Sequence, residues 1–188
     1  MTLGEGKNKV LKLIDEYSSG GTITPDEDIN LKMNDFFDIA QKQVAQIKKL
    51  VKSKKVSYTP GKRTEWKPPG DFLQVCRIWR NGKPANSRYR WMAGKIVIPA
   101  GETAELELEY FASPATIDAD TGDDYEFEVA EDAVQALPYF VAAQQLIVDL
   151  VVDSGPLLNM YNIMLSALDT RPPGGGALLQ NTFYTQGG

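Results

Sequence analysis

Histidine is missing from all 188 residues of this chain. It is the commonest general base near neutral pH and the commonest zinc ligand. Its absence excludes Ser–His and Cys–His nucleophile pairs and most zinc sites. Cysteine occurs once, as Cys76, which excludes an internal disulfide and indicates a small core or half-buried residue. We therefore expect a protein that is not an enzyme and that uses no cofactor and no metal.

Long apolar runs are scarce as well. The longest, from Leu137 to Val152, is broken by Gln144, Gln145 and Asp149 and is too short to span a bilayer. Glycine and charged residues interrupt the first ten positions, which therefore lack the apolar stretch of a signal peptide. We expect no membrane partner, no leader, and synthesis in the cytoplasm.

Two long stretches are each poor in charge of one sign, the first in acidic residues and the second in basic residues. From Lys42 to Lys95 there are 15 Lys and Arg against two acidic residues, and from Glu102 to Glu131 there are 11 acidic residues and no basic one. The two stretches can pair within one sheet or between copies of the chain. Either arrangement explains the asymmetry better than nucleic-acid binding, which the acidic stretch would oppose.

Two helices are predicted in the first 55 residues. Thr2 and Glu5 have the spacing of a capping box, and apolar residues then recur at helical spacing up to Tyr17. The stretch Thr24-Pro25-Asp26-Glu27 predicts the start of a longer helix with an apolar stripe from Ile29 to Val51. Lysines follow at its predicted end, where they suit the helix dipole: Lys48, Lys49, Lys52, Lys54 and Lys55.

Between residues 56 and 129 the apolar period changes to two, which is typical of strands. Asp71 to Arg80 reads as a strand, and the following Asn81-Gly82 is a strong signal for a hairpin turn. Shorter strands are expected at Ser87 to Trp91 and Lys95 to Ile98. In two further stretches apolar and acidic residues alternate: Leu106, Leu108 and Tyr110 with Glu105, Glu107 and Glu109, and Tyr125, Phe127 and Val129 with Glu126 and Glu128.

Helical spacing returns after Val129. Glu131 to Val152 is predicted to be helical, with Pro138 either kinking it or opening a second segment, and Leu157 to Leu168 forms a last helix. The predicted fold class is α+β. Residues 1–55 and 130–170 form a helical bundle, residues 56–129 form an inserted antiparallel β-sheet or sandwich, and residues 171–188 form a flexible C-terminal tail.

Two stretches resemble binding sites. The acidic loop from Asp118 to Asp124 has Gly122 at position 5 and Val129 at position 12, which does not fit a calcium loop and favours a solvated turn with Asx caps. From Cys76 to Trp91, arginines interleave with aromatic residues, as in some single-strand binders. Strand alternation places Arg88 and Arg90 on one face and Tyr89 and Trp91 on the other. It favours aromatic side chains in the core and arginines against Glu105, Glu107 and Glu109.

The order of the helical segments carries a family resemblance. A short helix leads to a helix that begins at Thr24-Pro25-Asp26-Glu27-Asp28, then to the β-insert, and then to EVAEDAVQALPYFVAAQQLIVDLVVDSGPLLNMYNIMLSAL. These segments resemble the head-tail connector (adaptor) proteins of tailed bacteriophages, most closely at Ala136 to Phe140, at Ala142-Ala143 and around Tyr161. The resemblance covers the helical ends, and over the β-insert it is architectural.

The resemblance implies a structural virion protein at the neck of the particle. Such proteins form a homo-oligomeric ring, commonly of twelve subunits, between the portal protein and the tail or a tail-terminator or stopper protein. The genome DNA passes through the ring without sequence-specific binding. Charge pairing between subunits would involve Arg88, Arg90, Glu105, Glu107 and Glu109. Docking of the tail on the portal would use Leu178, Leu179, Phe183 and Tyr184, with residues 172–176 as the tether.

Other interpretations stay open. A nucleic-acid-binding module would use the basic region from Lys48 to Arg90, and a small hydrolase would use the loop from Asp118 to Asp124 with calcium or magnesium. The tail could instead be a solvated end or pack on its own subunit.

Overall fold

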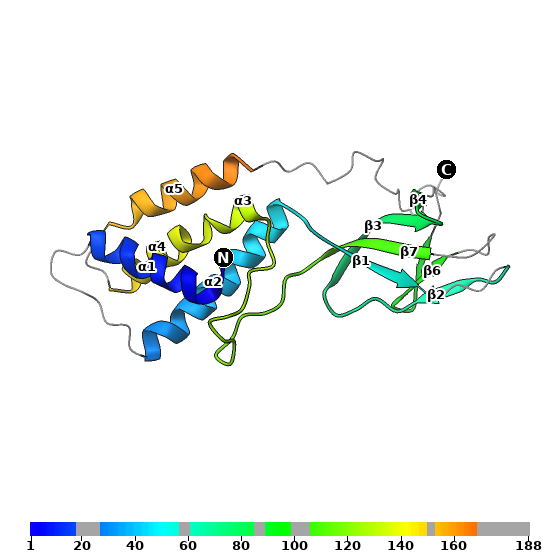
Figure 1. Ribbon diagram of the computed structural model, residues 1–188, viewed down its shortest axis with the longest axis horizontal. Helices are drawn as coiled ribbons and strands as arrows, with labels where there is room; N and C mark the ends of the chain where they lie inside the picture. The colour runs from blue at the N-terminus through cyan, green and yellow to red at the C-terminus, as the bar shows by residue number, and fades with distance from the viewer. Residues whose placement is uncertain (18–26, 57–60, 85–88, 99–105, 150–152, 169–188) are drawn as a thin grey trace. The chain divides into compact units, whose positions relative to one another are not determined.

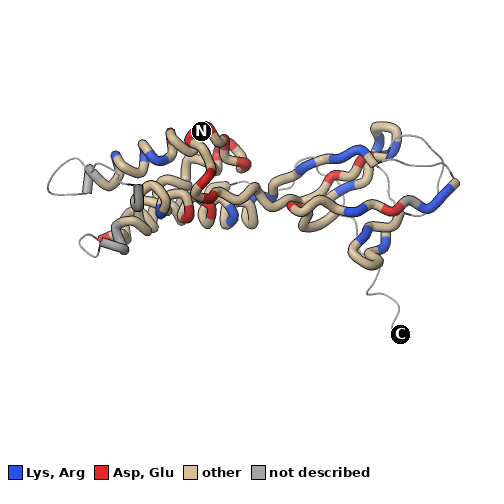
Figure 2. The backbone as a smooth tube through the Cα atoms, turned by 90° about the horizontal axis from the view of Figure 1, so that it is seen from below, with Lys and Arg blue, Asp and Glu red and all other residues tan. Residues whose placement is uncertain are grey.

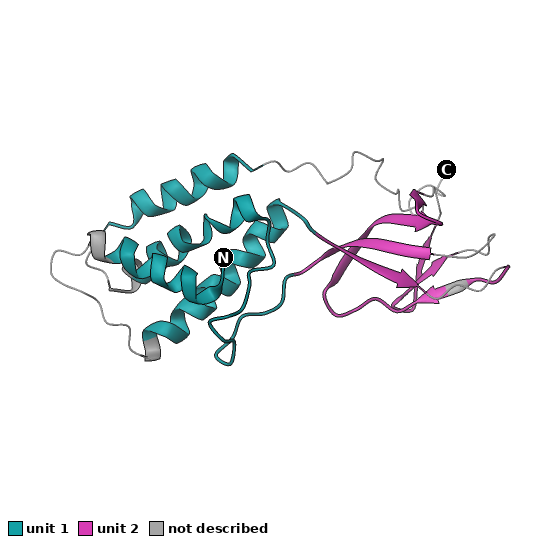
Figure 3. Cartoon of the chain, in the orientation of Figure 1, with its two compact units in different colours: residues 1–50, 114–172 teal, residues 51–113, 173–188 magenta. Residues whose placement is uncertain are grey.

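The computed structural model describes residues 1–17, 27–56, 61–84, 89–98, 106–149 and 153–168. They combine helices with antiparallel strand pairs, which makes the fold α+β, as predicted (Figure 1). They divide into two compact units (Figure 3). We call residues 1–50 and 114–168 the helical unit and residues 51–113 the β-unit.

The first helix, α1, spans Leu3–Tyr17, and its predicted capping box is confirmed. The Thr2 backbone N–H donates to Glu5 Oε2 over 2.9 Å, and the Glu5 N–H donates to Thr2 Oγ1 over 3.3 Å. These two bonds satisfy backbone donors that the first helical turn leaves unpaired. Val10 and Ile14 turn inward and are buried.

The second helix, α2, spans Glu27–Ile47, and its buried stripe is confirmed at Met33, Phe37, Ala40 and Val44. The predicted helical lysine end is wrong, because the chain turns after Ile47 and enters strand β1, Leu50–Val56. β1 is an edge strand beside β7, Leu106–Ala112. Pairing with β7 supplies backbone hydrogen bonds, while Lys54 and Lys55 on this edge strand are exposed and Lys52 pairs with Asp71 over 3.0 Å. Tertiary pairing therefore decides the structure of this segment.

Three helices follow the β-unit: α3, Glu131–Val134; α4, Leu137–Asp149; and α5, Gly155–Ser166. Of the two interpretations of Pro138, the second is confirmed, since α3 ends and α4 begins just ahead of it. α4 packs against α1, α2 and α5. Its small residues Ala142 and Ala143 are fully buried, which permits a close approach of the neighbouring helices.

The β-unit contains two sheets. One has the order β1-β7-β3-β4 and the other the order β2-β6-β5. The remaining strands are β2, Thr64–Trp66; β3, Phe72–Arg80; β4, Lys83–Pro84; β5, Arg90–Met92; and β6, Lys95–Ile98. The predicted alternation in β7 is confirmed, with Leu106, Leu108 and Tyr110 buried. The predicted hairpin at Asn81-Gly82 is also confirmed, and both residues have the positive φ of a type I′ turn.

The predicted strand around Tyr125, Phe127 and Val129 does not form. Only a single bridge, between Thr2 and Glu126, occurs there, and Phe127 packs on Phe37 of α2 with 5.2 Å between the ring centroids. The alternation reflects real burial, but the buried side faces helices rather than a second strand. The chain therefore returns to the helical unit at Pro114, well before the predicted boundary at residue 129.

Candidate functional site

Two of the glutamates predicted to face the arginines, Glu107 and Glu109, lie on β7, and we call these two residues the acidic ladder. Glu107 and Glu109 are half-buried there, and Glu109 pairs in register with Arg77 of β3, with 3.9 Å between Arg77 Nη1 and Glu109 Oε2. The Arg77 guanidinium also lies 5.2 Å from the centroid of the Trp79 ring, a cation–π contact. Within the chain, part of the ladder is thus met by Arg77, which the sequence patterns did not single out.

Arg90 does not share a sheet with this ladder. It lies on β5, in the three-stranded sheet, with an exposed side chain. Arg88 and Glu105 fall outside the described residues. Pairing of these charges between copies stays a prediction, and Glu109 already has a partner in its own subunit.

The aromatic residues of β5 divide between core and surface. Tyr89, next to the strand, is buried as expected, and burial raises the pKa of its phenol. Trp91 was expected in the core, but 43% of it is exposed. It stacks on Phe72 with 5.8 Å between the ring centroids and an interplanar angle of 18°. Because β5 is a three-residue edge strand, Trp91 stays partly in solvent although Phe72 stacks on it.

A groove opens beside Trp91. It has a volume of about 380 Å³ and is lined by Phe72, Leu73, Gln74, Val75, Tyr89 and Trp91. In β3, Phe72 pairs with Ala112 and Gln74 with Phe111, so Leu73 is an extra, unpaired residue. Such a bulge redirects a side chain, and Leu73 is 57% exposed. Sequence patterns missed this groove because its lining comes from two separate segments, residues 72–75 and 89–91.

The outward face of α5 is the second apolar surface. Pro156, Met160, Ile163 and Ala167 are exposed, at the 4-3-4 spacing that places residues on one stripe of a helix. Met160 is 44% and Ile163 is 53% exposed. The helix contains no charged residue. The opposite side packs on the core through Leu157 and Tyr161, and a separate exposed stripe is polar but uncharged, with Asn159, Asn162 and Ser166.

A second groove lies where α1, α4 and α5 meet. Its volume is about 280 Å³, and its lining combines apolar side chains with two lysines: Lys9, Lys12, Leu13, Gln135, Pro138, Tyr139 and Met164. Lys9 Nζ donates to Gln135 Oε1 over 2.7 Å. The groove is therefore continuous with α5 through Met164 and adds to the apolar character of this side of the helical unit.

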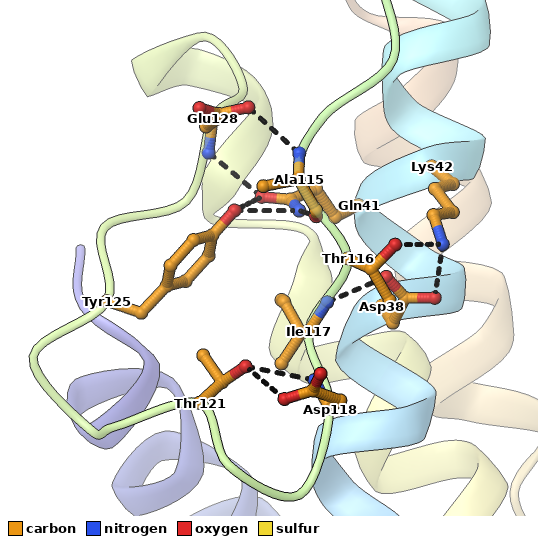
Figure 4. A network of polar contacts seen from close by, with 10 residues as sticks. All are labelled: Asp38, Gln41, Lys42, Ala115, Thr116, Ile117, Asp118, Thr121, Tyr125 and Glu128. Carbon is orange, nitrogen blue, oxygen red and sulfur yellow. Dashed lines mark hydrogen bonds and ion pairs between the residues drawn. The ribbon is translucent and has the colours of Figure 1, made fainter. Parts of the chain in front are cut away.

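A polar network fixes the segment from Ala115 to Glu128 on α2 (Figure 4). The fully buried Gln41 donates through Nε2 to the Ala115 carbonyl and accepts through Oε1 from the Glu128 N–H over 2.8 Å. The Tyr125 hydroxyl lies within hydrogen-bond distance of both amide atoms. One turn earlier, Asp38 Oδ1 accepts from the Ile117 N–H over 3.0 Å. The network is structural, because every contact holds a loop on a helix.

The acidic loop forms the predicted solvated turn. Asp118 Oδ1 accepts from the Asp120 N–H and from Thr121 Oγ1, which is an Asx-type arrangement. Lys7 pairs with Asp123 over 2.8 Å. Across the described residues, no three His, Cys, Asp or Glu side chains are grouped as metal ligands would be. None of the described helices has the length and apolar character needed to cross a membrane.

Charge separates between the two units. Residues 51–113 carry 12 Lys and Arg against 6 Asp and Glu, and the rest of the chain carries 8 against 19. Figure 2 shows lysines and arginines spread along the β-unit strands. The β-unit is thus strongly basic and the helical unit strongly acidic. The predicted docking residues Leu178, Leu179, Phe183 and Tyr184 lie outside the described residues.

Comparison with protein-family models and with curated proteins found no match to this chain. Its function must therefore be argued from the surfaces described above.

Proposed function

We propose that this chain is a structural virion protein, a head-tail connector (adaptor) subunit that forms a ring between portal and tail and lines the DNA channel. The outward face of α5 carries the proposal. A surface helix without charge that exposes Met160 and Ile163 is typical of an element that another protein covers. We propose that helical units pack side by side through this face and perform no enzymatic reaction.

Closing such a ring requires heterologous contacts, in which two different faces of each subunit meet. The helical unit has two candidate faces, because α5 and α2 pack on different sides of α4 (Figure 1). The proposed ring has about twelve copies, as in the family that the sequence resembles, and sits at the virion neck. Its partners are the portal on one side and the tail or a terminator or stopper protein on the other.

Two finer features belong to the proposal. The helices form a bundle around α4, and the two sheets face each other as a sandwich. Contacts between aromatic side chains of the two sheets support the sandwich. The centroid of the Trp66 ring in one sheet lies 5.6 Å from that of Phe72 and 5.8 Å from that of Tyr110 in the other. The tail then docks on the portal through Leu178, Leu179, Phe183 and Tyr184.

The test compares assembly of the wild-type protein with that of the double variant Met160→Glu/Ile163→Glu. Light scattering and electron microscopy, with and without the portal protein, should show rings for the wild type. Because a carboxylate cannot be buried without a partner, we expect the variant to lose assembly while keeping its circular dichroism and Tm. Asn162→Glu, also exposed on α5 but off the stripe, is the matched control. Rings of the double variant, or a wild type that never assembles, would refute the proposal.

The basic β-unit favours a second candidate, a nucleic-acid-binding module using Lys48 to Arg90. Such a module should bind single strands tightly, with a steep decrease of affinity as salt rises. A connector should bind DNA weakly and lose it at moderate salt. Titration of a labelled oligonucleotide at two salt concentrations separates the two functions.

A further inference from the structure

The three-stranded sheet of the β-unit carries an excess of positive charge. Its strands and the residues beside them, 61–67 and 89–98, contain five basic residues and a single acidic one, Glu65. The basic residues are all exposed: Lys62, Arg63, Lys67, Arg90 and Lys95. Charge of one sign gathered on a small sheet attracts a ligand of the opposite sign, so a polyanion is the chemistry that suits this surface.

Strand register separates the charged from the aromatic side chains of this sheet. Glu65 and Arg90 both pair with Val97 of the central strand, so they share one face. Trp66 and Trp91 occupy the next row and point to the opposite face, where both rings contact the four-stranded sheet. We call the face that carries Glu65 and Arg90 the outer face of the three-stranded sheet.

Contacts place two more cations on the outer face. Glu65 Oε2 accepts a hydrogen bond from Lys95 Nζ over 3.0 Å, and Glu65 Oε1 accepts one from Arg63 Nη2. These bonds, first the one from Arg63 and then the one from Lys95, lower the pKa of Glu65, so its carboxylate offsets one positive charge. Arg63 and Lys95 nevertheless keep 56% and 49% of their side chains exposed, and Arg90 makes no ion pair with a described residue. The outer face therefore remains cationic and open to solvent.

We infer that the outer face of the three-stranded sheet contacts the phosphate backbone of DNA through Arg63, Arg90 and Lys95. This contact rests on the proposed connector function and names the surface that lines the DNA channel. Because the aromatic residues of the sheet lie on the opposite face, the outer face offers cations without a platform on which bases could stack. The contact is thus independent of base sequence and gives single strands no advantage over duplex, which suits a genome that must move past it.

The salt dependence of DNA binding tests the contact. Arg63→Gln/Arg90→Gln removes two charges from the outer face, and the matched control Lys54→Gln/Lys83→Gln removes two exposed charges from the four-stranded sheet. Fluorescence anisotropy with a short labelled duplex follows binding to assembled protein, with portal present if assembly needs it. The slope of log affinity against log salt should become shallower by at least about two for the arginine variant and stay near wild type for the control. Circular dichroism establishes that both variants are folded.

Lysine footprinting provides a second test, in the wild-type protein. Acetylation of exposed lysines is followed by mass spectrometry with and without duplex DNA at low salt. DNA should protect Lys95 from acetylation and leave Lys54 and Lys83 as reactive as before, because those two lie on the other sheet.

The outcomes separate this contact from the connector function. A shallower slope for the arginine variant alone, together with protection of Lys95, supports the contact. A slope equal to that of the control, or a Lys95 that DNA does not protect, overturns the contact and leaves the connector function standing if rings form. A clear preference for single strands also overturns it and favours the nucleic-acid-binding module.

Ring assembly decides the remaining cases. If the arginine variant loses assembly, Arg90 serves the predicted charge pairing between copies and the DNA contact is overturned. If the wild type never assembles, alone or on the portal, the connector function is overturned and the channel contact falls with it.

Discussion

At the scale of single residues, Gln41 shows how a buried polar side chain can replace regular structure. It lies on α2 with no exposed surface, and its amide bonds to the backbone at Ala115 and Glu128 and to the Tyr125 hydroxyl. Buried backbone groups outside helices and strands need such partners, because leaving them unpaired costs free energy. The segment from Ala115 to Glu128 can therefore stay ordered without being a strand.

Replacing Gln41 by leucine should lower the free energy of unfolding by about 2–3 kcal/mol, because it leaves buried backbone groups without partners. Urea denaturation followed by circular dichroism measures the change. Gln46→Leu, at an exposed position of the same helix, is the control and should stay within about 0.5 kcal/mol of wild type. Equal stability of the two variants would mean that the network contributes little.

The buried phenol of Tyr161 leads us to expect that the stability of the fold depends on pH in alkaline solution. Burial raises the pKa of its phenol to about 12, above the ordinary value of 10.0, and its hydroxyl donates to Gln43 Oε1 over 3.1 Å. A raised pKa in the folded state contributes stability that is present below pH 10 and is lost as the pH rises towards 12. Tyr161→Phe should show a shallower decrease of Tm than wild type over this interval. Parallel Tm curves would contradict the assignment.

At the scale of elements, one hairpin turn could be predicted from the sequence, whereas the other hairpin turn and the edge strand β1 could not. Asn81-Gly82 specifies its turn because both residues tolerate positive φ. The turn from β5 to β6 uses Ala93-Gly94, with φ of 49° at Ala93, and alanine is not a turn signal. β1 was not predicted, because its lysine-rich sequence continues the helical pattern of the preceding residues. Only its pairing beside β7 makes it a strand.

The strain at Ala93 leads to an element-scale prediction. Ala93→Asn should raise the free energy of unfolding of the β-unit by about 0.5–1 kcal/mol, because asparagine tolerates positive φ better than alanine. Asn81→Ala should cost a similar amount. Thermal unfolding of the two variants measures both effects. A destabilising Ala93→Asn would show that the turn conformation is not limiting.

At the scale of the whole molecule, charge and apolar surface follow the division into units. The β-unit is basic and the helical unit is acidic, and each exposes large apolar side chains: Leu73, Trp91 and Met92 in one, and Leu31, Ile39, Met160 and Ile163 in the other. A monomer gains nothing from such surfaces, whereas a ring in which unlike faces meet buries them.

Removal of residues 171–188 tests the proposed role of the tail. The described core of the helical unit ends at Leu168, so we expect the truncated protein to keep its Tm within a few degrees. Docking on the portal should be lost, because Leu178, Leu179, Phe183 and Tyr184 are removed. Cosedimentation with portal rings measures docking. A large decrease of Tm would place the tail in the core of its own subunit and contradict the proposal.

The sequence by itself determined the helices, the capping box, the first hairpin and the buried alternation of β7. These features rest on local hydrogen bonding and on apolar periodicity, which are readable along the chain. Only the tertiary structure decided that Lys52 to Lys55 belong to a strand, that Phe127 packs on Phe37, and that Phe72, Leu73 and Trp91 enclose a groove. Each of these depends on contacts between distant segments, and the burial and pairing gained there outweigh the local preference of the residues involved.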